Sequence, residues 1–98
     1  MKYEIIFSED ALDDLYGIDQ WILWEAGAII ADAYYARLEA RLYSLQDFPN
    51  RGTPREDFGP GVRSVPFERT VTVYYSVEDQ NVVILRVMHG AREVGLLN

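Results

Sequence analysis

The sequence predicts an α+β fold in which two helices form an antiparallel hairpin on one face of a small, mainly antiparallel sheet. Two observations lead to this prediction. Apolar residues recur at helical spacing from residue 9 to residue 46, and from residue 62 onward they follow strand-like patterns. A short apolar segment precedes the first helix, so the predicted order is β-α-α-β-β-β. A chain of 98 residues can bury one core, and we expect residues 1–98 to form a single domain.

The first strand is predicted over residues 3–7, and the first helix from residue 9 to about residue 25. Ser8 is a suitable N-cap because its hydroxyl can accept a hydrogen bond from a free amide of the first turn. Glu9 and Asp10 follow where the helix dipole favours negative charge. The apolar stripe of this helix consists of Ala11, Leu15, Ile18 and Ile22. Three aspartates lie largely off the stripe, namely Asp13, Asp14 and Asp19.

Gly27 is expected to end the first helix as a left-handed C-cap, and the second helix is predicted over about residues 28–46. Pro49 and Gly52 follow it, and such residues stop helices. So short a connection between two helices predicts that they lie antiparallel. The apolar stripe of the second helix consists of Ile30, Tyr34, Leu38, Leu42 and Leu45. We expect the aromatic side chains of both helices to pack in the core and the hairpin, namely Trp21, Trp24, Tyr34 and Tyr35.

Three strands are predicted in the second half of the chain, over residues 62–67, 70–77 and 82–89. Pro66 predicts that the first of them lies at an edge, since proline cannot donate to a neighbouring strand. The middle strand alternates between an apolar and a more polar face. The last strand is apolar on both faces apart from Arg86 and His89, which is typical of a central strand. The strand at residues 3–7 is expected beside the last one, parallel to it.

The composition limits the possible functions. The net charge is −7, whereas proteins that bind nucleic acid by themselves usually carry a surplus of Lys and Arg. The chain has no cysteine, which excludes disulfides and favours the reducing cytoplasm. The first residues lack the layout of a signal peptide, and no apolar run is long enough for a membrane span. No cofactor or metal is expected, because no metal-ligand spacing and no glycine-rich loop before a helix is present.

Five stretches, in the same order, resemble the ParE/RelE toxin superfamily of type II toxin–antitoxin systems. The most specific is ILRVMHGARE at residues 84–93, which is similar to the ParE-type ending ILRVLHGxRD. The other four are SEDALDDL at 8–15, LQDFPNRG at 45–52, VRSV at 62–65 and VTVYYSV at 71–77.

This resemblance implies a ParE-like toxin of a plasmid-stabilising type. Such a toxin inhibits DNA gyrase by protein binding, without a catalytic step, and is neutralised by a cognate ParD-like antitoxin. We expect the antitoxin's C-terminal helix to lie in a groove between hairpin and sheet, with its acidic groups paired to arginines. Two alternatives remain: a RelE-like ribosome-dependent mRNA interferase, and a non-toxic module that only binds an antitoxin.

An interferase would need a base and cations at the reacting phosphate, and the candidates are His89, Arg63 and Arg86. RelE-like nucleases also use lysines in mid-chain and a tyrosine near the C-terminus. This sequence has no lysine after Lys2 and no tyrosine after Tyr75, which favours the ParE-like alternative.

The residues predicted to contact the target or the antitoxin are Arg63, Arg86, His89, Arg92, Leu96 and Leu97. Two of them have a structural interpretation as well. His89 can serve packing or a structural hydrogen bond, and Arg86 can pair with an acidic residue of a helix. The relative facing of Arg63 and Arg86 depends on the turn near Glu68: a two-residue turn separates them, and a turn of odd length places them on one face.

Overall fold

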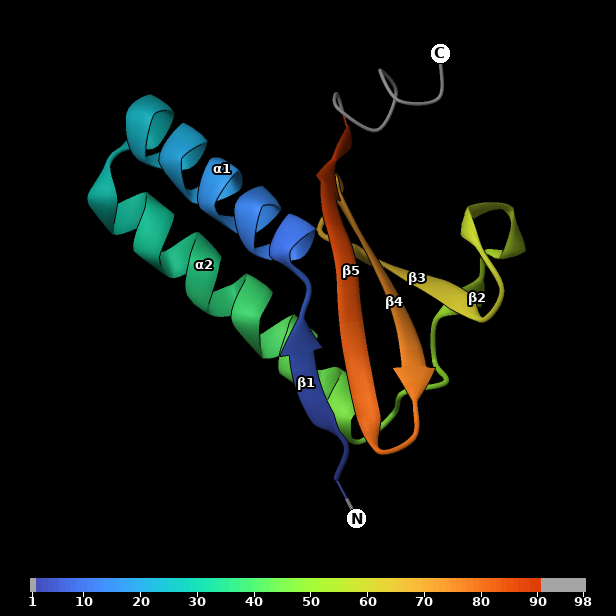
Figure 1. Ribbon diagram of the computed structural model, residues 1–98. Coiled ribbons are helices and arrows are strands. Elements are labelled where there is room, and N and C mark those ends of the chain that lie inside the picture. Colours follow the sequence, from blue (N-terminus) through green and yellow to red (C-terminus); the bar gives the residue numbers. More distant parts are fainter. Residues whose placement is uncertain (1, 91–98) are drawn as a thin grey trace.

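The computed structural model describes residues 2–90 and contains every predicted element (Figure 1). Two short 3₁₀ turns and one two-residue strand were not predicted. The elements are β1 (Glu4–Phe7), α1 (Glu9–Ala26), α2 (Ala28–Tyr43), η1 (Ser44–Gln46), β2 (Thr53–Pro54), η2 (Glu56–Phe58), β3 (Val62–Phe67), β4 (Val71–Glu78) and β5 (Asn81–His89).

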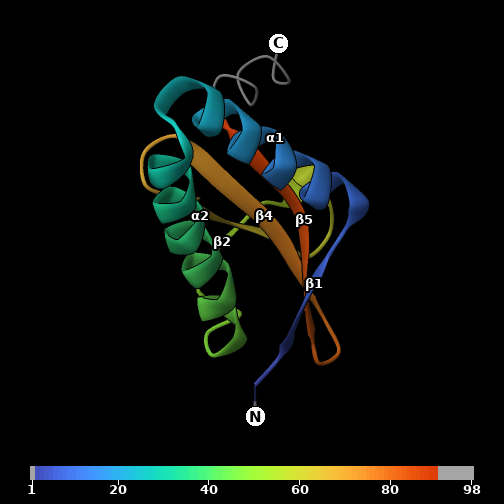
Figure 2. The same cartoon turned by 90° about the vertical axis from the view of Figure 1, so that its left-hand side faces the viewer.

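The sheet has the strand order β1-β5-β4-β3-β2. Strand β1 lies parallel to β5, and β4 pairs antiparallel with both β5 and β3, as predicted. The unpredicted strand β2 pairs antiparallel with β3. The edge prediction for β3 was only half right, because β2 pairs with it at Ser64 and Arg63. Among residues 2–90, no strand pairs with the half of β3 that contains Pro66 on the side away from β4. Figures 1 and 2 show the hairpin of α1 and α2 on one face of the sheet.

Local signals account for the hairpin. The Ser8 hydroxyl accepts a hydrogen bond from the Ala11 amide at 3.0 Å, which confirms the predicted N-cap. Gly27 joins the helices with φ at 90° and ψ at 170°, a conformation that favours glycine but is not the left-handed helical one expected. Helix α2 ends at Tyr43, and the last three residues assigned to it by the sequence form η1 instead.

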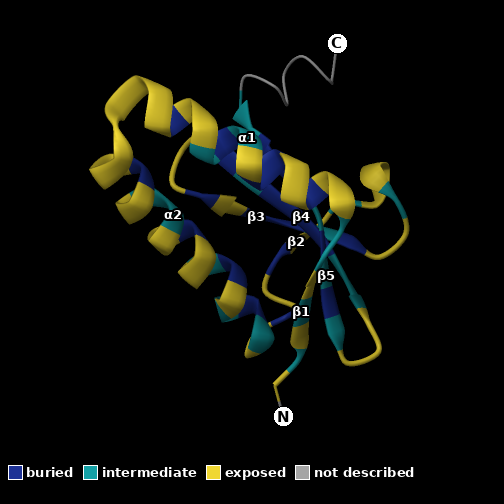
Figure 3. Ribbon diagram, turned by 60° about the vertical axis from the view of Figure 1, so that its left-hand side comes forward, coloured by how far each residue is buried: buried dark blue, intermediate teal, exposed yellow. Residues whose placement is uncertain are grey.

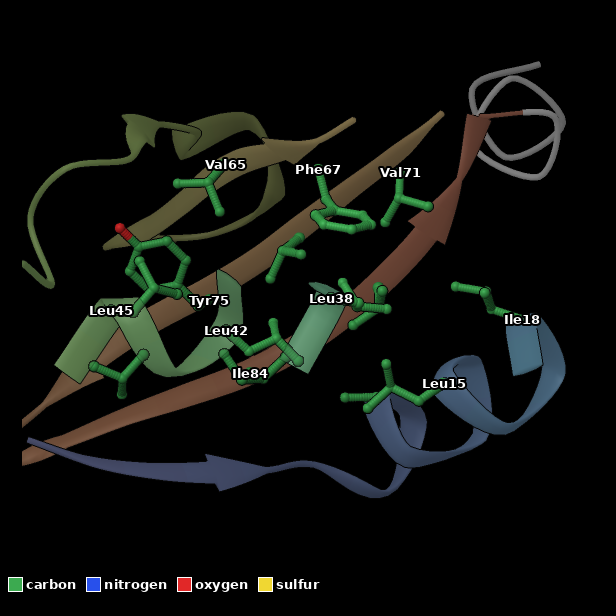
Figure 4. Packing of buried hydrophobic residues seen from close by; sticks show 14 of the residues in the cluster. Leu15, Ile18, Leu38, Leu42, Leu45, Val65, Phe67, Val71, Tyr75 and Ile84 are labelled. Carbon is green, nitrogen blue, oxygen red and sulfur yellow. The ribbon is translucent and has the colours of Figure 1, made fainter. Parts of the chain in front are cut away.

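The core lies between the hairpin and the sheet (Figure 4). All six side chains predicted to be buried there are buried: Leu15, Ile18, Ile22, Leu38, Leu42 and Leu45. Ile30 was predicted wrongly, since its side chain is 54% exposed while the neighbouring Ala31 is 2% exposed. The prediction was also wrong for Trp24, which is 87% exposed, and only partly right for Trp21, which is 51% exposed but packs against His89. These three residues lie toward the tip of the hairpin, which extends past the sheet (Figure 3).

Strand β5 contains a β-bulge at Leu85. Ile84 pairs with Tyr75 and Arg86 pairs with Tyr74, so Leu85 has no partner on β4. Compared with a regular strand, the bulge places every later residue of β5 on the opposite face of the sheet. On the sheet face away from the helices, Leu85 packs against a second, smaller cluster of Val62, Tyr74 and Met88.

Candidate functional site

Arg86 is bound to a buried carboxylate of the first helix. Its Nε and Nη2 atoms donate to the two oxygens of Asp14 at 2.7 and 3.0 Å, and the Val87 amide donates to the same carboxylate at 2.9 Å. Asp14 is 3% exposed, so its place off the apolar stripe was a wrong prediction. The signal was present in the sequence: Asp14 lies three residues after Ala11 and four before Ile18, on the same helix face.

The start of α1 replaces a missing strand at the edge of β5. Pairing between β1 and β5 stops at Ile84. Beyond it the Ser8 hydroxyl donates to the Leu85 carbonyl at 2.9 Å, and Asp14 accepts from the Val87 amide. A buried edge amide must find a partner, which explains why a carboxylate is buried here. The Asp14 carboxylate raises the pKa of Arg86. Arg86 thus forms the ion pair with an acidic helix residue, one of its two interpretations.

Arg63 holds the loop that follows the second helix. Its Nη1 atom donates to the carbonyl oxygens of Asn50 and Gly52 at 3.1 and 2.7 Å. The Tyr75 hydroxyl, opposite Arg63 in the sheet, donates to the Pro49 carbonyl at 2.7 Å and accepts from the Gly52 amide at 3.0 Å. A side chain at Gly52 would meet this hydroxyl at 2.6 Å. The arginine and the tyrosine together fix the loop.

Arg63 and Arg86 lie on opposite faces of the sheet. Three residues, 68–70, form the turn between β3 and β4, so the turn has odd length and Arg63 lies opposite Tyr75. We expected an odd turn to place both arginines on one face. The bulge at Leu85 overturns that expectation, because it moves Arg86 from opposite Val73 to opposite Tyr74. Tyr74 and Tyr75 are consecutive residues of β4, so their side chains point to opposite faces of the sheet. Their partners Arg86 and Arg63 therefore also lie on opposite faces.

His89 packs against the first helix. Its ring lies edge-on to that of Trp21, with 4.9 Å between the centroids and an interplanar angle of 61°. His89 is opposite Val71 and Arg63 is opposite Tyr75, so four residues, about 13 Å of strand, separate them along β4. The structure therefore does not bring the three nuclease candidates together. The remaining predicted contacts, Arg92, Leu96 and Leu97, lie outside the described residues.

Within residues 2–90, no group of three or more His, Asp or Glu side chains is arranged to hold a metal ion. In the same part of the chain, neither helix combines the length and the apolar character that crossing a membrane requires.

A family model described as the ParE toxin of the type II toxin–antitoxin system parDE matches residues 5–94. The chain belongs to the ParE toxin family. Toxin ParE3 of Caulobacter vibrioides is 34% identical over 64 residues, which cover 65% of this chain and 63% of that protein. The match thus spans less than two thirds of the relative.

Solved toxin structures share the fold of this ParE-family chain. The chromosomal ParDE system of P. aeruginosa matches with a TM-score of 0.78 at 24% identity, over 90% of this chain and 96% of that one. The toxin–antitoxin complex RelBE2 of Mycobacterium tuberculosis matches with a TM-score of 0.66 at 28% identity, over 91% and 99%. The E. coli DinJ–YafQ complex matches with a TM-score of 0.64 at 13% identity, over 94% and 97%. The ParDE and DinJ–YafQ likenesses show the fold alone.

The structure also shows a surface that the sequence did not predict. A groove of about 450 Å³ runs between α1 and α2 on the solvent side of the hairpin. Its apolar lining comes from Leu12, Leu15, Tyr16, Tyr35 and Ala36, and its carboxylates from Asp19, Asp32 and Glu39. Tyr16 is 68% exposed. Burial raises the pKa of Tyr35, and the nearby carboxylates of Glu39 and Asp19 raise it further.

Proposed function

We propose that this chain inhibits DNA gyrase by protein contact, without a catalytic step, in the cytoplasm, and that a cognate ParD-like antitoxin neutralises it. Family membership supports the toxin role. The observation that favours inhibition by contact over RNA cleavage is the separation of Arg63, Arg86 and His89.

Cleavage of RNA requires a base, a proton donor and cations around one phosphate. In this chain the two arginines point to opposite faces and are engaged with Asp14 and with loop carbonyls. His89 lies against Trp21, remote from Arg63. A net charge of −7 would also repel the ribosome at long range. These features favour a protein target.

The outer surface of the hairpin supports a protein partner. Its exposed apolar side chains include Trp24 and Ile29, which are 87% and 85% exposed. Exposed apolar clusters of this kind mark interaction surfaces, and Figure 3 shows the exposed face of both helices. This groove lies between α1 and α2, a different place from the one expected between hairpin and sheet. An amphipathic helix of the antitoxin fits it if apolar residues face the floor and basic residues face the carboxylates.

The proposal is tested with the purified protein, free of antitoxin, in a gyrase supercoiling assay and in a translation assay that follows ribosome-bound mRNA. We expect loss of supercoiling and intact mRNA. The His89→Gln variant retains hydrogen bonding but cannot act as a base near neutrality, and it should inhibit gyrase as the wild type does. The antitoxin from the neighbouring reading frame should restore supercoiling. If the wild type cleaved mRNA and His89→Gln did not, the mRNA interferase function would replace this proposal. If the protein were inactive in both assays, the function of a non-toxic antitoxin-binding module would remain.

A further inference from the structure

Three guanidinium groups line one pocket at the C-terminal end of α2, beside the open half of β3. The pocket has a volume of about 480 Å³. Arg37 and Arg41 reach it from α2, and Arg51 reaches it from the loop that follows η1. Glu68 lies on its rim and pairs with Arg37 at 2.8 Å.

Arg41 and Arg51 have neutral partners. The Nε and Nη2 atoms of Arg41 donate to the Pro66 carbonyl at 3.2 and 3.1 Å, and Nη1 of Arg51 donates to the Ser44 hydroxyl at 3.4 Å. No ion pair to either arginine occurs among residues 2–90. Two positive charges therefore stand in one pocket, and within residues 2–90 neither has a carboxylate at ion-pair distance.

The position of Arg41 is fixed by the sheet. Strand β2 covers β3 only at Ser64 and Arg63, so the Pro66 carbonyl faces outward and the guanidinium satisfies it. A guanidinium has five N–H donors. The two hydrogen bonds to Pro66 use the N–H of Nε and one N–H of Nη2, so the remaining N–H groups of Arg41 can donate to a ligand. An arginine held in place loses less conformational entropy when it binds.

The distribution of charge favours an anionic ligand at this pocket. Between residues 9 and 36 the chain has seven acidic residues and no basic one. The arginines begin at Arg37, and three of them line this pocket of an otherwise acidic chain. A nucleic acid would meet the carboxylate of Glu68 and the net charge of −7. A peptide with one or two carboxylates meets much less repulsion, because it carries far less charge itself.

We propose that Arg41 and Arg51 bind the carboxylates of an acidic segment of the antitoxin. This inference rests on the proposed function, because it assigns the site to the neutralising partner. It also moves the expected pairing of acidic antitoxin groups with toxin arginines away from Arg63 and Arg86, which the fold engages internally.

The test is an NMR titration of the ¹⁵N-labelled protein that follows the arginine Nε–H signals. The probe is a capped peptide with two adjacent glutamates between alanines, and its control has glutamine in both places. We expect the Arg41 and Arg51 signals to shift with the glutamate peptide and not with the glutamine peptide. Arg51→Gln should weaken binding about fivefold, as for a partly exposed pair. Arg69→Gln makes the same charge change at an exposed position outside the pocket, and it should bind as the wild type does.

Separate arms distinguish the ligand sources. The proposal would be overturned if inorganic phosphate or a single-stranded oligonucleotide shifted the Arg41 and Arg51 signals and the glutamate peptide did not. Equal shifts with the glutamate and glutamine peptides would overturn it too. The affinity of the neighbouring-gene antitoxin for Arg51→Gln and Arg69→Gln is then measured by calorimetry. Equal affinities overturn the inference while the proposed function stands. A wild type that binds no antitoxin refutes the neutralising partner, and with it the assignment of this site to an antitoxin segment.

Discussion

Replacing Arg86 by Met should destabilise the protein more than replacing Asp14 by Asn, although both changes break the same ion pair. The reason is the unequal burial of the partners. The Asp14 side chain is 3% exposed and the Arg86 side chain is 37% exposed. Arg86→Met leaves a buried carboxylate that has lost its cation and keeps the hydrogen bond from the Val87 amide. Asp14→Asn instead leaves a guanidinium that is partly open to water.

The two magnitudes follow from these environments. Removing one partner of a buried pair costs about 3–5 kcal/mol. The exposed side of Arg86 lets water approach the vacated space, so we expect about 3 kcal/mol for Arg86→Met. Asp14→Asn keeps an oxygen for the Val87 amide and loses the charge-assisted bonds, a loss of about 1–2 kcal/mol. Together the changes should cost less than their sum, because the groups are in contact.

Urea unfolding followed by circular dichroism at neutral pH measures both variants and the double variant. Gyrase inhibition is measured in parallel, under conditions in which each variant is folded. An Arg86→Met variant as stable as Asp14→Asn, or more stable, would refute the argument from burial. A variant with wild-type stability and no inhibition would instead identify Arg86 as a contact with the target.

Two further predictions concern the core. Leu42→Ala should cost about 2–5 kcal/mol because Leu42 is 2% exposed. Ile30→Ala is the control, with a change within about 0.5 kcal/mol; urea unfolding compares them. Burial raises the pKa of Tyr75 above its ordinary value of about 10, so the stability from its neutral form is complete below that pH and is lost as the pH rises through the raised pKa. Tyr75→Phe should cost about 1–2 kcal/mol at neutral pH and should lose less stability than the wild type between about pH 10 and pH 11, measured by urea unfolding at each pH.

The elements and the core were predictable because each depends on neighbours in sequence. Ser8 caps the helix that it precedes, and the stripe from Leu38 to Leu45 follows from helical spacing alone. The position of Ile30 depends on where the hairpin leaves the sheet. Periodicity does not contain that information, and Ile30 was placed wrongly.

The candidate site was less predictable because its geometry depends on one bulge and one buried charge. No residue type marks Leu85 as a bulge, yet the bulge decides which face Arg86 occupies. An arginine in a sequence also does not reveal its partner. Asp14 and Arg86 are 72 residues apart, and only the packing of α1 on the edge of β5 brings them together.

The cost of engaging an arginine with a partner depends on which groups of the fold would lose their hydrogen bond or ion pair to it. If Arg86 turned to a target, a carboxylate with 3% exposure would lose its cation, at a cost of about 3 kcal/mol. If Arg63 turned away, the carbonyls of Asn50 and Gly52 would lose their donor. Arg51 would leave only the hydroxyl of Ser44, which already donates to the Arg41 carbonyl. Of these three arginines, a partner therefore recruits Arg51 at the least cost to the fold, and Arg86, which belongs to the family ending, at the greatest cost.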